Sequence, residues 1–217
     1  LNIGNFKLFE LLINKLQIPQ RWKQRLIKFF WNEKYFSELL KRLESNLDID
    51  PVAVAGDKKM YSKMIKLNQK KIINGRSYKE IIKRFESKIN DPRQSETGKK
   101  SAKIIKEFLK IKCSLNNAPN ILNKFFKKYD LNIFVNKDFF PIKNLKTKET
   151  KFEFSTSIGR GREVEFYNSL IFSLDVKKKN KFVNLISGGR FDELTSKYLG
   201  LKKIPAVGAA VNLSNYE

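Results

Sequence analysis

The stretch from residue 187 to residue 210 constrains the fold most strongly, because its glycines, helix signal and apolar run occur in one fixed order. It follows the apolar run at 182–186, which is short enough for a strand. Gly188 and Gly189 come next, and we expect them to form a turn from which Arg190 projects. Glycine permits positive φ at such a turn and allows a second backbone or a ligand to come close.

A helix and a second strand are expected after this turn. Residues 191–198 have helical spacing, and Gly200 follows where a helix stop belongs. The apolar run at 206–211 then predicts a strand. Upstream, residues 150–156 and 164–176 alternate between apolar and polar side chains, as strands do. The short connections between these segments predict an antiparallel sheet.

The first half of the chain is dominated by helical patterns. Asn5 is predicted to cap a helix over 6–16, and Pro19 to open the next helix. Ser77 and Glu80 have the spacing of a capping box at the start of another helix. Further helices are expected over 36–43, 61–67, 101–115 and 118–129.

Residues 48–57 contain Pro51 and Gly56, which predict a loop. Cys113 falls within the helical pattern of 101–115 beside apolar neighbours, so we expect it to occupy a core position and not to act as a nucleophile.

The glycine-containing stretch also resembles a known family. Its residues GGRFDELTSKYLG and IPAVGAAV are similar to the GGRYDGL…PAVGFA block of histidyl-tRNA synthetase and its paralogues, which contains motif 3 of class II synthetases. Residues 161–172, GREVEFYNSLIF, resemble the family's histidine-binding signature RGLDYYTGxVF. The first 26 residues and the segment GRSYKEIIKRF resemble the ATP phosphoribosyltransferase regulatory subunits among these paralogues.

This resemblance implies an α+β fold, with a class II synthetase-like antiparallel sheet flanked by helices and a helical insertion. We expect residues 1–217 to form part of one such domain. Residues 32–130 would be the mostly helical insertion, and 131–217 the C-terminal antiparallel sheet that carries the histidine signature and the motif 3-like block. The chain begins at Leu1 and not at Met, so we expect an N-terminal part to be missing.

Four residues are implied by the resemblance to contact histidine: Arg162, Glu165, Tyr167 and Phe191. A guanidinium can bind a carboxylate through two parallel hydrogen bonds, and a tyrosine ring can cover a flat imidazole. From the residues alone, we favour a charge pair on a strand surface for Arg162 and Glu165, and half-buried packing for Tyr167; the resemblance favours ligand contact. Phe191 stands where the family has tyrosine, so it keeps the ring and loses the hydroxyl.

Two further positions bear on the chemistry. Arg190 can bind a ligand or tie the glycine turn to Asp192. Asn215 stands where the synthetases have the arginine that contacts ATP. Because an amide cannot replace a cation that neutralises phosphate charge, we expect adenylation to be badly weakened.

Composition excludes several classes of site. The chain contains no histidine and one cysteine, so Ser-His-Asp and Cys-His catalysis, disulfides within the chain and clustered cysteine zinc sites are excluded. We predict no catalytic residue, no metal site and no cofactor. The single cysteine agrees with a reducing, cytoplasmic setting. No apolar run approaches the ~20 residues that span a membrane.

The net charge of +23 is typical of proteins with an anionic partner such as nucleic acid. The lysines are spread along the chain instead of forming one basic stripe, and lysine, asparagine, isoleucine and phenylalanine are all abundant. We therefore favour compositional drift, and expect no nucleic-acid partner. A basic nucleic-acid-binding protein stays a third alternative; it predicts RNA binding that falls steeply with salt.

The resemblance implies a regulatory subunit of ATP phosphoribosyltransferase, which is not an enzyme on its own. Such a subunit binds the short-form catalytic subunit in a hetero-oligomer, activates it and helps mediate feedback by histidine. The alternative is a divergent histidyl-tRNA synthetase, which is an ATP-dependent ligase.

Overall fold

The computed structural model describes residues 1–47, 49–67, 72–73, 75–140, 150–161, 165–179 and 181–215. Its strands are β1 (Asn2–Asn5), β2 (Ile72–Ile73), β3 (Arg76–Ser77), β4 (Lys112–Ser114), β5 (Glu153–Ser155), β6 (Leu170–Lys178), β7 (Lys181–Arg190) and β8 (Val207–Val211). Its α-helices are α1 (Phe6–Lys15), α2 (Gln20–Lys28), α3 (Glu33–Glu44), α4 (Pro51–Leu67), α5 (Tyr78–Ile89), α6 (Glu96–Leu109), α7 (Ala118–Lys128) and α8 (Leu194–Leu199).

Six strands form one mixed sheet in the order β4-β5-β1-β6-β7-β8. The C-terminal strands β6, β7 and β8 pair antiparallel, as predicted. β1 pairs antiparallel with β6 but parallel with β5, through Asn2 opposite Glu153. A parallel pair needs a long connection, and here that connection includes the helices from α1 to α7.

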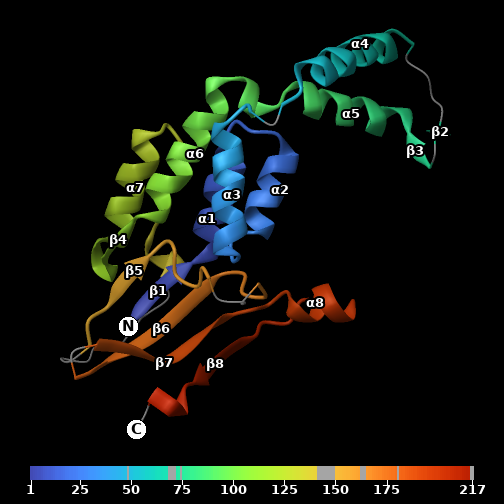
Figure 1. Ribbon diagram of the computed structural model, residues 1–217. Coiled ribbons are helices and arrows are strands. Elements are labelled where there is room, and N and C mark those ends of the chain that lie inside the picture. Colours follow the sequence, from blue (N-terminus) through green and yellow to red (C-terminus); the bar gives the residue numbers. More distant parts are fainter. Residues whose placement is uncertain are drawn as a thin grey trace.

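The helices α1, α2, α3, α6 and α7 lie together on one side of this sheet (Figure 1). Ile3, Phe154 and Ile171 contribute buried side chains from three different strands to the core. The predicted α+β class, a sheet flanked by helices, is therefore confirmed.

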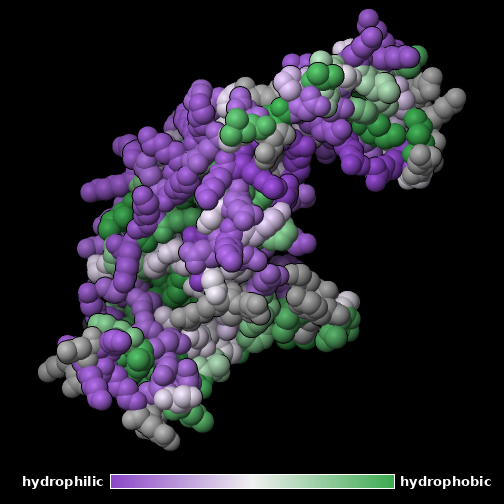
Figure 2. Space-filling view, in the orientation of Figure 1, coloured by the Kyte–Doolittle hydropathy of each residue, from purple (hydrophilic) through white to green (hydrophobic). Residues whose placement is uncertain are grey.

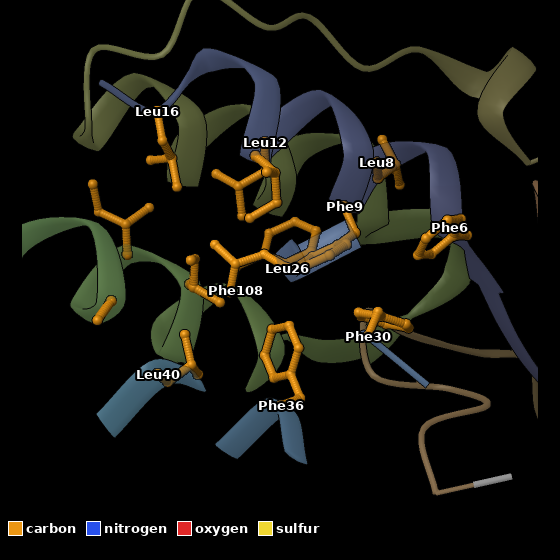
Figure 3. Close-up of a cluster of buried hydrophobic side chains, with 14 of the residues drawn as sticks. Phe6, Leu8, Phe9, Leu12, Leu16, Leu26, Phe30, Phe36, Leu40 and Phe108 are labelled. Carbon is orange, nitrogen blue, oxygen red and sulfur yellow. The ribbon is translucent and has the colours of Figure 1, made fainter. Parts of the chain in front are cut away.

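An aromatic cluster forms the centre of the core (Figure 3). The ring of Phe9 lies 4.4 Å from that of Phe30 and 5.8 Å from that of Phe36, measured between centroids.

Asn5 fixes the start of α1, because its side chain accepts a hydrogen bond from the Lys7 amide at 3.0 Å. The first helix is thus capped as the sequence predicted, and its apolar face is buried.

Helices α4 and α5 form an arm that projects away from the sheet and its covering helices (Figure 1). The capping box predicted at Ser77 and Glu80 is present at the start of α5. The loop predicted over residues 48–57 is wrong, because α4 already begins at Pro51. Proline is tolerated in the first helical turn, where its missing N–H costs no hydrogen bond.

The helix predicted over 101–115 also needs correction. α6 ends at Leu109, and Cys113 lies on β4, opposite Phe154 of β5. Cys113 is half-buried and packs against the core, and burial raises the pKa of its thiol. A short apolar run covers too few residues for its periodicity to distinguish a strand from the end of a helix. Residues 112–114 form a strand because they pair with β5.

Most of the visible helical surface is hydrophilic, whereas hydrophobic side chains are exposed along the C-terminal segments and on the arm (Figure 2). Among the described residues, none of the helices is both long enough and apolar enough to cross a membrane.

Candidate ligand-binding site

A pocket of about 460 Å³ opens between the first helices and the segment that precedes β6. Phe6 and Glu10 of α1, Trp31 after α2, residues 165–168 and Glu193 line it. Helices α2 and α8 add four further residues, Gln24, Ile27, Lys28 and Leu194. The pocket therefore draws on segments from both ends of the chain.

Two of the residues implied to contact histidine line this pocket. Glu165 is exposed at it, and Tyr167 is half-buried. Phe191 lies outside the lining, with its ring 6.2 Å from the ring of Tyr167 and 5.7 Å from that of Phe166. Arg162 lies outside the described residues. The structure thus brings Glu165, Tyr167 and Phe191 together, with Phe191 packed beside the residues that line the pocket.

Gly189 of β7 makes room for the ring of Tyr167. A Cβ atom at Gly189 would lie 2.7 Å from the Tyr167 Cδ1 atom, which is closer than carbon atoms can approach. The neighbouring amide of Asn168 donates a hydrogen bond to the Arg190 carbonyl oxygen at 3.0 Å. The absence of a side chain at Gly189 therefore allows the histidine-signature segment to pack against β7.

The predicted turn at Gly188, Gly189 and Arg190 is misplaced. β7 continues through Arg190, and the chain turns only after it. A Cβ atom at Gly188 would lie 2.4 Å from the carbonyl oxygen of Gly208 and 2.6 Å from the ring of Phe172. The glycines allow close approach of neighbouring groups, as the sequence predicted, but they do so within a strand and not in a turn.

Arg190 ties the end of β7 to the entry of β8. Its Nε donates to both carboxylate oxygens of Asp192, at 2.9 and 2.7 Å, and the Ala206 amide donates to Asp192 Oδ1 at 3.0 Å. Burial alone would raise the pKa of Asp192, but the hydrogen bonds from Arg190 and Ala206 together hold this pKa below its usual value. Of the two roles open to Arg190, the structural tie is observed.

A second pocket, of about 630 Å³, lies beside the first. Gly189 and Arg190 line it, together with Lys7, Asp192 and Phe172. The charge of Lys7 lowers the pKa of Asp192 here and that of Glu10 in the first pocket. The charge of Lys7 therefore acts on one carboxyl group in each of the two pockets.

The loop at residues 159–161 holds Trp31 in place. Gly159 has a φ of +84°, and a Cβ atom there would lie 2.9 Å from the Trp31 ring. The Gly161 amide donates to the Trp31 carbonyl oxygen at 3.0 Å, while the guanidinium of Arg160 lies 5.0 Å from the centre of the Phe36 ring. The glycines of this segment thus shape one side of the pocket, because both adopt positive φ.

Glu10 is one of the pocket residues that were not predicted from the sequence. It is half-buried, and burial raises the pKa of its carboxyl group. The negative charge of Glu193 raises this pKa further, and Lys7 opposes the shift. Its position one helical turn after Phe6, on the side of α1 next to the apolar face, was the available signal.

Asn215 makes a structural contact. Its Nδ2 donates to the carbonyl oxygen of Asn184 at 2.8 Å and so fastens the segment after β8 to β7. Within the part of the chain that the structure describes, no group of three His, Cys, Asp or Glu side chains is placed to hold a metal ion.

Comparison with known proteins gives the following relations. No family model matches the chain. Curated proteins named ATP phosphoribosyltransferase regulatory subunit match 99% of it, at 22% identity in Brucella anthropi, 28% in Allorhizobium ampelinum and 27% in Rhizobium johnstonii. The chain spans 61% of the length of these relatives.

Two solved structures align with nearly all of the chain. One is described as an ATP phosphoribosyltransferase regulatory subunit/histidyl-tRNA synthetase from Bacillus halodurans, with 19% identity, a TM-score of 0.36 and coverage of 99% of this chain and 42% of that one. The other is a histidine–tRNA ligase subunit from Alicyclobacillus acidocaldarius, with 16% identity, a TM-score of 0.35 and coverage of 99% and 51%. The resemblance predicted from the motifs is confirmed by the curated relatives: over almost its whole length, the chain is similar to ATP phosphoribosyltransferase regulatory subunits.

Proposed function

We propose that this chain acts as the regulatory subunit of an ATP phosphoribosyltransferase, in the first step of histidine biosynthesis. The observation that supports this most directly is its similarity, over 99% of its residues, to proteins that bear this name. On this proposal the chain transfers no phosphoribosyl group itself. It binds a short-form catalytic subunit in a cytoplasmic hetero-oligomer and activates it. Residues 131–217 carry the histidine signature and the motif 3-like block, and residues 32–130 form a mostly helical insertion.

Histidine is the proposed effector, and the pocket beside α1 is its proposed site. Tyr167 offers an aromatic face to the imidazole, and Glu165 a carboxylate to the amino group. Arg162 pairs with the ligand carboxylate, and Phe191 supports the ring of Tyr167. Histidine then shifts the subunit arrangement through its different affinity for two states of the complex.

A divergent histidyl-tRNA synthetase is the second candidate, because the GGRFDEL and PAVGAA motifs resemble those of the synthetases. The contact of Asn215 with Asn184 argues against it. A neutral amide used to hold two segments together supplies no positive charge to a triphosphate.

The test is to mix the chain with a short-form catalytic subunit and to measure formation of the phosphoribosyl-ATP product. We expect the rate to rise when the chain is added and to fall again with histidine, whereas heat-unfolded chain has no effect. Absence of activation, together with histidine-dependent ATP–pyrophosphate exchange by the chain alone, would instead establish the synthetase.

A further inference from the structure

The charge of the first pocket is opposite to that of the chain. The chain has a net charge of +23. Yet three carboxyl groups, those of Glu10, Glu165 and Glu193, line the pocket, and Lys28 is the one basic residue among the described residues of the lining. In a chain with twice as many basic as acidic residues, this local excess of carboxylates favours a ligand with positive charge.

The three carboxyl groups are not equivalent. Glu165 and Glu193 are exposed, and Glu193 forms an ion pair with Lys203 at 2.5 Å. Glu10 is half-buried and makes no hydrogen bond or ion pair with another described residue. Among the described residues, Glu10 and Glu165 are therefore the carboxyl groups whose acceptor atoms remain available to a ligand, and Glu10 is the more buried of the two.

The surroundings of Glu10 make its ionised form costly in the empty pocket. Burial raises the pKa of Glu10, Glu193 raises it further from the turn before α8, and Lys7 of α1 lowers it. Lys28 from α2 and Glu165 from the segment before β6 also line the pocket. A cation placed beside Glu10 would offset both the burial and the repulsion by Glu193.

The other groups in the pocket also suit a donor-rich ligand. The Oδ1 atom of Asn168 is fully buried and has no hydrogen-bond partner among the described residues, although Asn168 lines the pocket. Buried acceptors of this kind are normally satisfied. Phe6, Trp31, Phe166 and Tyr167 add aromatic rings, whose faces attract cations and stack on planar groups.

We propose that Glu10 makes this pocket selective for ligands that carry a positive charge next to a planar group, and that the Glu10 carboxylate pairs with that charge. A protonated amine attached to an imidazole is the chemical class that fits. The inference rests on the proposed function only for the choice of histidine as one probe. Affinity for the cation then rises with pH as Glu10 ionises in the free protein.

Isothermal titration with three probes tests the proposal: L-histidine, histamine as a cation without a carboxylate, and 3-(imidazol-4-yl)propionate as the analogue without an amine. We expect histidine and histamine to bind the full chain, and Glu10→Gln to weaken both by about tenfold to a hundredfold. Glu38→Gln on the exposed side of α3 makes the same charge change outside the pocket, and we expect no effect from it. The anionic analogue should bind more weakly than histamine to the wild-type chain.

The dependence of affinity on pH gives a readout that a merely structural role would not change. We expect the advantage of the wild-type chain over Glu10→Gln in histamine binding to grow as the pH rises and Glu10 ionises. Glu10→Asp, which keeps the carboxylate, should recover most of the lost affinity.

Each outcome has a separate meaning. Binding of histamine that Glu10→Gln leaves unchanged would overturn the inference, as would an anionic analogue that binds as tightly as histamine. Binding of histamine without histidine would support the inference and count against histidine as the effector. Binding of histidine that does not depend on Glu10 would contradict the inference and support histidine as the effector. Binding of neither histidine nor histamine by the wild-type chain would contradict both the inference and the effector proposal.

Discussion

At Gly188 the backbone has no room for a side chain. The carbonyl oxygen of Gly208 and the ring of Phe172 occupy the space where a Cβ atom would lie. Gly208 belongs to β8, which pairs with β7, so its carbonyl oxygen cannot move without disturbing the ladder.

We predict that Gly188→Ala lowers the free energy of unfolding by about 1–3 kcal/mol, because a methyl group must displace backbone atoms. Gly56→Ala is the matched control: it lies in α4 with no atom within 4 Å of the added carbon. There alanine should be neutral, or stabilising by about 0.5–1 kcal/mol. Urea unfolding followed by circular dichroism measures both, and an equal loss in the two variants would refute the account of Gly188.

Sequence reasoning at the residue scale succeeded where the cause is local. The pairing of Arg190 with Asp192 follows from chemistry within a few residues. Glu10 was missed, because its burial depends on the segment at 165–168 and on Glu193, which are distant in the chain.

At the scale of elements, Asp192 connects β7 to β8. Its folded pKa lies below the usual value, so its contribution to stability is present above the unfolded pKa, near 3.9, and is lost as the pH falls through the folded value. The pair is partly exposed and solvent screens it, which limits its contribution.

We predict that Asp192→Asn lowers the free energy of unfolding at neutral pH by about 0.5–1 kcal/mol. The difference from wild type should shrink as the pH falls and Asp192 becomes protonated in both the unfolded and the folded chain. Glu86→Gln, which removes an exposed charge from α5, is the control and should show no such dependence. A difference for Asp192→Asn that is independent of pH would contradict this assignment.

Elements defined by local signals were predicted well, and those defined by distant pairing were not. The caps at Asn5 and Ser77 need only neighbouring amides, and both are present. The strand at Cys113 exists because β5 pairs with it. β1 also pairs with β5, in parallel, although the helices from α1 to α7 lie between these two strands in the sequence. Helical periodicity carries no information about such partners.

At the scale of the whole molecule, the aromatic core joins the N-terminal helix α1 to α3 and α6. Phe36 of α3 is fully buried and lies within 6.1 Å of Phe30 and 5.8 Å of Phe9, between ring centroids. Its removal would leave a cavity that the rigid rings around it cannot fill.

We predict that Phe36→Ala lowers the free energy of unfolding by about 3–5 kcal/mol. Phe182→Ala is the matched control, since Phe182 lies on β7 with 74% of its surface exposed, and its removal should change stability by less than about 0.5 kcal/mol. Thermal melts of the three proteins measure this. Similar midpoints for the two variants would mean that the core is not centred on the Phe9–Phe30–Phe36 cluster.

The central claim, that the chain is a regulatory subunit with a histidine-sensing pocket, is tested most directly by titrating histidine into the complex with a short-form catalytic subunit. Phosphoribosyltransferase activity would be measured with the wild-type chain, with Tyr167→Leu, and with Tyr61→Leu, which removes a tyrosine from α4 outside the pocket. We predict activation by all three chains and reversal of this activation by histidine with the wild type and Tyr61→Leu. Reversal should need at least about tenfold more histidine with Tyr167→Leu, because the aromatic contact is lost. Activation by none of the chains, or equal reversal in all three, would contradict the account.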